Sequence, residues 1–230
     1  AYLGLLIVWP LSLVVLHTFD CGLANLSAAL SDPDVVFALK MSVYVAVWAV
    51  LLNTVFGVGI SLQLVRQEFR GKRLLSLLID LPLAVSPVVV GLALLLAYGG
   101  SEGLFGSALE KHGLQVAFAP PGMILATAFI SLPLVIREIV PVLQEIGTDQ
   151  EQAARSLGAG SWQTFWRITL PSIKWALVYG VVLSLARALG EFGAVVFIAG
   201  NLPGKTEIAS LLAFIRLEEH DYRGAAALAL

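Results

Sequence analysis

Residues 39–65 read LKMSVYVAVWAVLLNTVFGVGISLQLV, and no charged residue stands between Lys40 and Arg66. A helix that crosses a lipid bilayer needs about 20 mainly apolar residues, because its side chains face hydrocarbon and its backbone must bond to itself. This stretch exceeds that length. It therefore predicts a transmembrane helix, and it sets the fold class of the chain.

Other stretches have the same apolar character and a similar length. They are Tyr2–Phe19, Leu74–Tyr98, Pro121–Leu143 and Trp175–Ala199. A sixth begins at Gly224–Leu230 and is cut off there, so we expect the chain to be trimmed at both ends. The sequence thus predicts an all-α, polytopic membrane protein with about six transmembrane helices, five of them complete. We expect residues 1–230 to form a single transmembrane domain.

The composition excludes several classes of protein. Hydrophobic residues make up 58% of the chain and charged residues only 13%, whereas a soluble domain is about 25% charged. Too little polar surface remains for a soluble enzyme or a disordered protein. A net charge of −2 gives no basic footprint for nucleic acid. One cysteine and three scattered histidines form no metal-binding pattern, so we expect no metal site and no catalytic residues.

The basic residues of the connecting segments predict the orientation in the membrane, because lysine and arginine favour the cytoplasmic side. Alternating loops place seven of them on one side: Arg66, Arg70, Lys72, Arg73, Arg155, Arg167 and Lys174. The other side carries five, diluted by acidic residues. We therefore expect segments 66–73 and 144–174 to be cytoplasmic, with the N-terminus of the chain also in the cytoplasm.

Charged residues also fall within or at the ends of the predicted spans, where a charge at the bilayer centre costs about 2.5–3.5 kcal/mol. Arg187 and Glu191 stand four residues apart, so they share a helix face and can pair. Such a pair either locks the bundle or presents a cation to a divalent anion, and both interpretations stay open. We expect Arg137 and Glu138 to extend toward the cytoplasmic surface.

Prolines interrupt two of the predicted spans. Pro82 and Pro87 fall in the third span, and Pro133 and Pro141 in the fourth. Each proline removes one backbone hydrogen bond, so we expect kinked helices. Asp80 is expected to cap or hydrogen-bond at the kink before Pro82.

The connection after the fourth span includes TDQEQAARSLGAGSWQTFWRITLP at residues 148–171. Thr148 with Glu151 three residues later is a capping-box pattern, which predicts the start of a short helix. The helix should end near Leu157, because Gly158 suits a left-handed C-cap. Ser161 can then cap a second helix.

The second helix carries an aromatic face and leaves two interpretations open. Trp162, Phe165, Trp166 and Thr169 fall on one side at helical spacing, and Pro171 is expected to close the unit before the next span. Either the tryptophans rest in the lipid headgroup layer, or small residues at the turn let another protein approach. Those small residues are Ala153, Ala154, Gly158 and Ala159.

This segment resembles the cytoplasmic signature of ABC-importer permeases, which is Glu-Ala-Ala, three residues, Gly, nine residues, Ile, one residue and Leu-Pro. Gln152-Ala153-Ala154, Gly158, Ile168 and Leu170-Pro171 match it at the full spacing. The departure is Gln152 in place of the glutamate, with Glu151 one position earlier. The resemblance implies that the segment couples to an ATPase. The implied set is Glu151, Gln152, Ala153, Ala154, Gly158, Ala159, Ile168, Leu170 and Pro171.

Three further segments look like parts of the sulfate and molybdate permeases. They are DLPLAVSPVVVG at 80–91, RALGEFG at 187–193 and AGNLPGKT at 199–206. The resemblance implies the type I importer fold and a permease subunit for a tetrahedral oxyanion, most like the sulfate/thiosulfate subunits. A molybdate or tungstate permease and a secondary transporter without an ATPase are the alternatives. A membrane enzyme lacks a constellation of catalytic residues.

The resemblance also implies the setting of the protein. Expected partners are a dimer of cytoplasmic ABC ATPases, a second and paralogous permease chain, an external substrate-binding protein and membrane lipid. ATP and magnesium would be used by the ATPase, and this chain would bind no cofactor and hydrolyse nothing. The expected location is a bacterial-type cytoplasmic membrane. We assign Asp80, Ser86, Arg187 and Glu191 to the translocation pathway.

Overall fold

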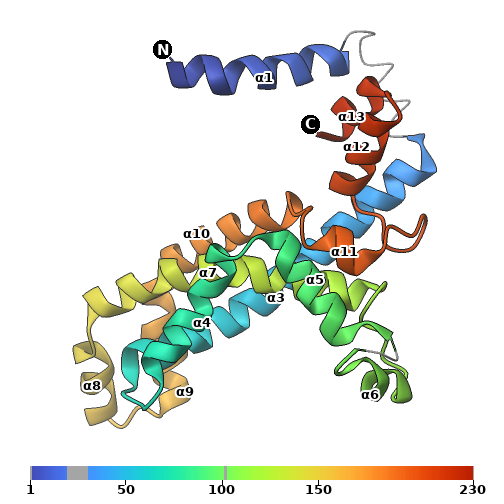
Figure 1. The fold of residues 1–230 in the computed structure, drawn as a ribbon. Helices are drawn as coiled ribbons and strands as arrows, with labels where there is room; N and C mark the ends of the chain where they lie inside the picture. Colours follow the sequence, from blue (N-terminus) through green and yellow to red (C-terminus); the bar gives the residue numbers. More distant parts are fainter. Residues whose placement is uncertain (1, 20–30, 101–102, 230) are drawn as a thin grey trace.

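The computed structural model describes residues 2–19, 31–100 and 103–229, and this part of the chain is helical without a strand (Figure 1). The longer helices are α1 (Tyr2–Phe19), α3 (Pro33–Arg66), α4 (Lys72–Ala84), α5 (Pro87–Tyr98), α7 (Pro120–Ile146) and α10 (Leu170–Leu189). The shorter ones are α6 (Gly106–Lys111), α8 (Asp149–Ser156), α9 (Ser161–Thr164), α11 (Val195–Ala199), α12 (Ala209–Glu218) and α13 (Tyr222–Ala229). A π-helical turn, η2 (Phe165–Thr169), joins α9 to α10.

Three helices of the described chain are long and apolar enough to cross a membrane: α3, α7 and the continuous helix Ser161–Leu189 formed by α9, η2 and α10. The pair α4–α5 passes the same test only when its two helices are taken together, as a broken span or a re-entrant loop. Helix α1 coincides with the predicted first span and contacts α13, which lies where the sixth span was expected. The prediction of an all-α, polytopic membrane protein is confirmed.

Helix α7 is the centre of the bundle, because both α3 and α10 pack along it (Figure 1). Val135 of α7 is completely buried where the three helices meet. A Cβ on Gly57 of α3 would lie 2.7 Å from Cγ1 of Val135, and a Cβ on Gly180 of α10 would lie 3.0 Å from its Cα. The two glycines therefore let the helices approach closely, which is how helices pack in lipid.

A buried polar contact also joins these three helices. Asn53 of α3 is buried, and its Nδ2 donates to the hydroxyl of Ser131 on α7 at 2.8 Å and to that of Ser184 on α10 at 3.2 Å. The Ser131 hydroxyl donates in turn to the Thr127 carbonyl at 2.6 Å. The Asn53 amide gains these two partners only when the three helices are in register, so the contact specifies their alignment.

The third span is broken, and the fourth is not. Helices α4 and α5 meet at an angle of 113°. Ser86 is extended there, with φ −60° and ψ 135°, because a residue before proline avoids the helical region and Pro87 follows. The kink expected in this span is thus confirmed, and it is sharp enough to divide the helix. By contrast, α7 runs without interruption past Pro133 and Pro141.

Two predicted boundaries are wrong. The fifth span was expected at Trp175–Ala199, but the helix begins at Ser161 and ends at Leu189. It ends because the side chain of Glu191 accepts the backbone N–H of Ala194 at 2.9 Å, which turns the chain before α11. The polar composition of Gly200–Arg223 likewise predicts a connecting segment, but helix α12 lies within it.

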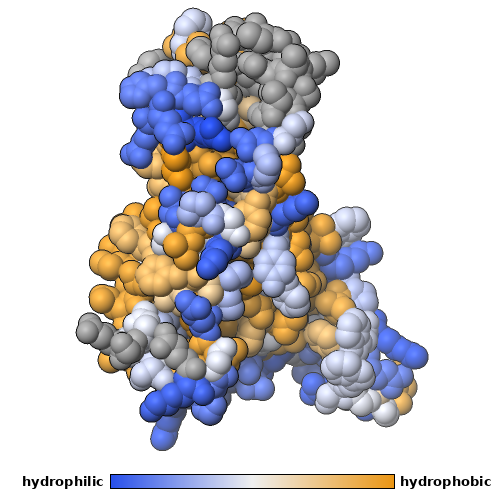
Figure 2. Space-filling model, turned by 90° about the vertical axis from the view of Figure 1, so that its right-hand side faces the viewer, coloured by the Kyte–Doolittle hydropathy of each residue, from blue (hydrophilic) through white to orange (hydrophobic). Residues whose placement is uncertain are grey.

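Apolar side chains cover much of the outer surface. Figure 2 shows broad hydrophobic areas between hydrophilic groups at the top and bottom of the face that it presents. Soluble monomers rarely expose apolar patches of this extent. Exposed residues of α3 include Val55, Phe56 and Leu51, which point away from α7 and α10. This distribution fits a protein whose solvent is lipid over the middle of its length.

Opposite the α8–α9 end, a carboxyl group is buried where the start of α3 meets α12. Burial raises the pKa of Glu207, the nearby carboxylates of Asp34 and Asp32 raise it further, and Arg216 of α12 lowers it. Arg216 is already paired with Asp32, at 2.7 Å from Nη2 to Oδ2. Because Arg216 is already paired with Asp32, it offsets only part of the rise in the pKa of Glu207.

We expect Asn53→Leu to lower the free energy of unfolding by about 1 kcal/mol, because hydrogen bonds between membrane helices contribute about 0.6 kcal/mol each on average. Denaturant titration of the purified chain in detergent measures the change. Thr54→Val is the matched control, since the Thr54 hydroxyl donates only to the Val50 carbonyl of its own helix, at 2.7 Å. Equal effects of the two variants would contradict a role in helix alignment.

We expect Glu207→Gln to raise the thermal stability of the protein at pH 7. The folded chain holds a proton at Glu207 more tightly than the unfolded chain, so this carboxyl favours folding below its ordinary pKa of 4.5 and loses that contribution as the pH rises through its raised pKa. The gain should vanish in acid below the ordinary pKa. Glu219→Gln removes the same charge from an exposed position and is the control; a gain that persists in acid would contradict the assignment.

Candidate functional site: the α8–α9 surface unit and its junction with the spanning helices

Helices α8 and α9 form a short surface unit at one end of the bundle (Figure 1). Helix α8 ends at Ser156 with Leu157 as its C-cap residue, and Gly158 follows with φ +89°, the left-handed conformation that favours glycine. The N–H of Ala159 donates to the Ala154 carbonyl at 3.0 Å, which closes the turn. The two helices and the glycine turn lie where the sequence predicted them.

The predicted capping box does not form. The Thr148 side chain caps no backbone N–H of α8, and its hydroxyl instead accepts a hydrogen bond from Gln152 Nε2 at 2.8 Å. Nor does Ser161 cap the second helix; Gly160 holds the N-cap position without a side-chain bond. The capping box fails because Glu151, its expected second member, bonds elsewhere.

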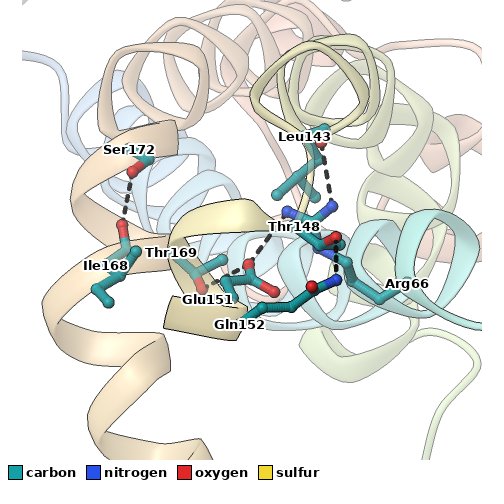
Figure 3. Close-up of polar contacts among 8 residues, drawn as sticks. All are labelled: Arg66, Leu143, Thr148, Glu151, Gln152, Ile168, Thr169 and Ser172. Carbon is teal, nitrogen blue, oxygen red and sulfur yellow. Dashed lines mark hydrogen bonds and ion pairs between the residues drawn. The ribbon is translucent and has the colours of Figure 1, made fainter. Parts of the chain in front are cut away.

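Glu151 joins α8 to the ends of two spanning helices (Figure 3). Its Oε1 lies 3.1 Å from Arg66 Nη2 at the end of α3, and it accepts the Thr169 hydroxyl of η2 at 2.9 Å. Arg66 Nη1 donates onward to the Leu143 carbonyl of α7 at 3.3 Å. One carboxylate thereby connects α8 with α3 and the α10 helix directly, and with α7 through Arg66.

The charges of this junction match the helix ends that meet there. Arg66 lies at the C-terminal ends of α3 and α7, where the helix dipoles are negative, and Glu151 lies in the first turn of α8, where the dipole is positive. The Leu143 carbonyl is among the last four of α7, which have no partner within the helix. The Arg66 and Glu151 side chains are only 16% and 12% exposed, so water screens their attraction weakly.

The π-helical turn brings Thr169 into this junction. The sequence placed Thr169 on the same face as Trp162 and Trp166, but Thr169 is buried, whereas Trp162 is 74% exposed and Trp166 is 51% exposed. The expected four-residue face is therefore wrong. A π turn adds a residue to the regular helical repeat, so the residues after it rotate relative to those before it.

The implied coupling residues divide into an outward group and an inward group. Gln152, Ala153, Gly158 and Pro171 are exposed, and Ala154, Ala159, Ile168 and Leu170 are half-buried. Leu157, between the two short helices, is 90% exposed. No residue of α8 is buried, although the Glu151 side chain points inward. The outward group thus combines small and apolar residues with polar Gln152, next to the exposed charges of Asp149 and Arg155 on α8.

Pro171 does not close the surface unit, contrary to the prediction. It occupies the first turn of α10, and the helix runs continuously from Ser161 to Leu189. Proline is tolerated because the π turn precedes it: the N–H of Leu170 bonds to the Phe165 carbonyl, five residues back. The surface unit therefore passes into the spanning helix without a flexible joint.

Of the residues assigned to the pathway, Arg187 and Glu191 form the expected ion pair, at 2.7 Å from Nη1 to Oε2. Glu191 is buried and Arg187 is partly exposed. The segment after them packs on α5: a Cβ on Gly193 would lie 3.0 Å from the Cβ of Pro87, and one on Gly91 would lie 2.8 Å from the Cα of Ala194. The fold thus joins two of the segments that the sequence singled out.

Asp80 lies apart from that pair. It accepts both Nε and Nη2 of Arg137 at 3.1 and 2.9 Å, and both side chains are about half exposed. Asp80 therefore bonds to Arg137 instead of at the kink, contrary to the prediction, and Arg137 is exposed while paired with it. Ser86 is exposed at the N-cap of α5 and makes no side-chain cap bond.

Sequence reasoning missed the two partners of Glu151. Arg66 was counted only as one of several loop charges, and Thr169 was assigned to the aromatic face. A signal was present for Arg66, since it is the first charge after the long apolar run and thus stands at a helix end. No sequence pattern indicated the π turn that orients Thr169.

Comparison with known proteins places the chain in a family. The family described as "Binding-protein-dependent transport system inner membrane component" matches residues 36–230. The sulfate transport system permease protein CysW of Synechococcus elongatus is 49% identical over 210 residues, 91% of this chain and 73% of that protein. The sulfate transport system permease protein CysT of Escherichia coli K12 is 42% identical over 228 residues, 99% of this chain and 82% of that protein.

A solved structure has the same fold. The bacterial alginate ABC transporter, crystallised in complex with an alginate pentasaccharide-bound periplasmic protein, contains a chain that superposes with a TM-score of 0.81. The match covers 99% of this chain and 84% of that one, at 18% sequence identity. The arrangement of helices around α7 is thus that of an importer permease, and the chain belongs to the family of binding-protein-dependent transport system inner membrane components.

Proposed function

We propose that this chain is a permease subunit of an ATP-driven importer for a tetrahedral oxyanion, sulfate or thiosulfate. The observation that carries the proposal is its identity of 42–49% to sulfate transport permeases over at least 91% of its length. Molybdate and tungstate have the same charge and a similar shape, and they are the alternative substrates. Residues 1–230 would act as one transmembrane domain, with segment 144–174 as its coupling loop.

The α8–α9 end would face the cytoplasm. Arg66, Arg70, Lys72 and Arg73 lie within eight residues at this end, and basic residues in short loops favour the cytoplasmic side. The start of the chain would then also lie in the cytoplasm, and the connection between α11 and α12 outside. A bacterial-type cytoplasmic membrane is the expected location.

The outward surface of α8 would dock on a cytoplasmic ABC ATPase. Around Gly158, where a Cβ would meet nothing within 4 Å, it exposes Ala153 next to polar Gln152. Beside it lies a hollow of about 200 Å³ whose lining includes the guanidinium groups of Arg66 and Arg155 and the carboxylate of Glu151, a positive balance that would suit an acidic side chain of the partner. ATP and magnesium would belong to the ATPase, and this chain would bind neither.

The remaining partners follow from the same proposal. A second, paralogous permease chain would complete the pathway, since the chain is similar to proteins named CysW and to proteins named CysT. An external binding protein would deliver the anion. Lipid would surround the apolar faces of the bundle.

The translocation pathway would pass the break between α4 and α5. Arg187 is partly exposed, and the chain that follows its partner Glu191 packs against Pro87 at this break through Gly193, so the guanidinium would donate to an oxyanion there. Glu191 would hold the guanidinium in place, and Ser86 could contribute a hydroxyl from the N-terminus of α5. Asp80 would contribute through its pair with Arg137 at the side of α4.

The proposed association with an ATPase is tested by purifying the tagged full-length chain from solubilised membranes and assaying ATPase activity in the eluate. Gly158→Trp should abolish both ATPase recovery and ATP-driven sulfate uptake, because it fills the open side of the turn. Gly158→Ala has the same left-handed backbone strain without the bulk and should retain both. Recovery of a folded chain without ATPase in the wild type would favour a secondary transporter, and normal uptake by Gly158→Trp would exclude docking at this glycine.

The pathway role of Arg187 is tested with its ion-pair partner neutralised as well. The double variant Arg187→Gln, Glu191→Gln leaves no unpaired buried charge, so it should fold. We expect its uptake of labelled sulfate to fall by about tenfold or more, since a hydrogen bond to a charged group contributes roughly 1.5–3 kcal/mol. Glu191→Gln alone keeps the cation and is the control. Full uptake by the double variant would leave the pair a purely structural role.

A further inference from the structure

Helix α8 has few ways to hold its position on the bundle. Helix α8 buries none of its residues, so apolar packing contributes little to its attachment. It follows α7 through Gly147, which has φ +67° and where a Cβ would meet nothing within 4 Å. The side-chain contacts of α8 must therefore determine how firmly it follows the spanning helices.

The Glu151 carboxylate makes the long-range contacts of α8 in the described part of the chain. Gln152 and Ser156 bond only within four residues, to Thr148 and to the Gln152 carbonyl. Glu151 instead reaches Arg66, 85 positions away, and Thr169, 18 positions away. The side-chain hydrogen bonds that attach α8 to α3 and to η2 thus come from a single residue.

We propose that Glu151 is the positioning residue that transmits a displacement of α8 to α3, α7 and α10, with Arg66 and Thr169 as its partners. The inference rests on the proposed docking of α8 on an ATPase. It assigns the two neighbouring residues different tasks: exposed Gln152 faces the docking partner, and the inward Glu151 connects the docked helix to the membrane bundle.

The energetics favour a contact that transmits the motion of α8 over a contact that only holds α8 in place. Removing one member of a buried ion pair is strongly unfavourable, because the other charge is left without compensation. The pair therefore holds over a displacement that would separate two exposed charges, which attract each other weakly. The bond from Thr169 connects Glu151 to a second helix. That helix is continuous from Ser161 to Leu189, so it can carry the displacement across the membrane.

The test compares sulfate transported with ATP hydrolysed, in proteoliposomes that contain the chain with its co-purifying ATPase. Glu151→Gln should retain the ATPase in normal stoichiometry and continue to hydrolyse ATP. Sulfate uptake per ATP should fall by about tenfold, within the range that coupling between two sites usually spans. Asp149→Asn is the matched control, because it removes a carboxylate from the same first turn at an exposed position without an ion pair.

Two further variants distinguish a loss of coupling between α8 and the bundle from a general loss of stability. Thr169→Val keeps the ion pair and should lower the ratio less than Glu151→Gln does. Arg66→Gln combined with Glu151→Gln should be no worse than either single change, since residues that act through one contact are not additive.

The possible failures are distinguishable. A wild-type ratio of sulfate to ATP in Glu151→Gln would overturn the inference and leave the proposed function intact. A Glu151→Gln chain that loses the ATPase altogether would also overturn it, because Glu151 would then act in docking. A wild-type chain without ATP-driven sulfate uptake would overturn the proposed function itself.

Discussion

The contact between Glu151 and Arg66 is the interaction on which the position of α8 depends, because it joins this helix to the rest of the molecule. One part is the bundle of α3, α7 and α10, which buries its own contacts. The other is helix α8, which has no buried residue. Without the carboxylate of Glu151, the link between them would be the chain itself and the apolar contacts of Phe165 and Leu170 with the end of the bundle.

The bundle shows how a membrane protein becomes rigid where lipid offers no hydrophobic driving force between helices. Its helices approach through Gly57 and Gly180 on either side of Val135, and they are aligned by the bonds of Asn53 to two serines. A rigid bundle of this kind can carry a displacement from one end to the other. The broken α4–α5 pair and the turn at Glu191 lie beside it, where a pathway could open without unfolding a packed helix.

The sequence was sufficient for the class of fold, the positions of most spans and the glycine turn at Gly158, because each depends on a local property: apolar length or backbone conformation. It was insufficient where tertiary contacts override local preference. Thr148 and Glu151 form an ideal capping pattern, yet Arg66 attracts the carboxylate more strongly from the end of another helix. The π turn at Phe165–Thr169 leaves no pattern in the residues. The prolines of the third and fourth spans also look alike in the sequence, although only the third span is divided into two helices.

The role of Glu151 in moving α3 with α8 is tested most directly by the distance between α8 and the far end of α3 during the ATP cycle. Spin labels at Ser156→Cys and Lys40→Cys, in a chain whose Cys21 is replaced, can be measured by pulsed electron resonance in the complex with the ATPase. Lys40 and Arg66 are separated by about 39 Å of helix, so the distance reports on the junction. If Glu151 makes α8 and α3 move together, the two labels give one narrow distance that is the same with and without bound ATP. A distance that shifts or broadens when ATP binds, in a complex that transports sulfate, would contradict it.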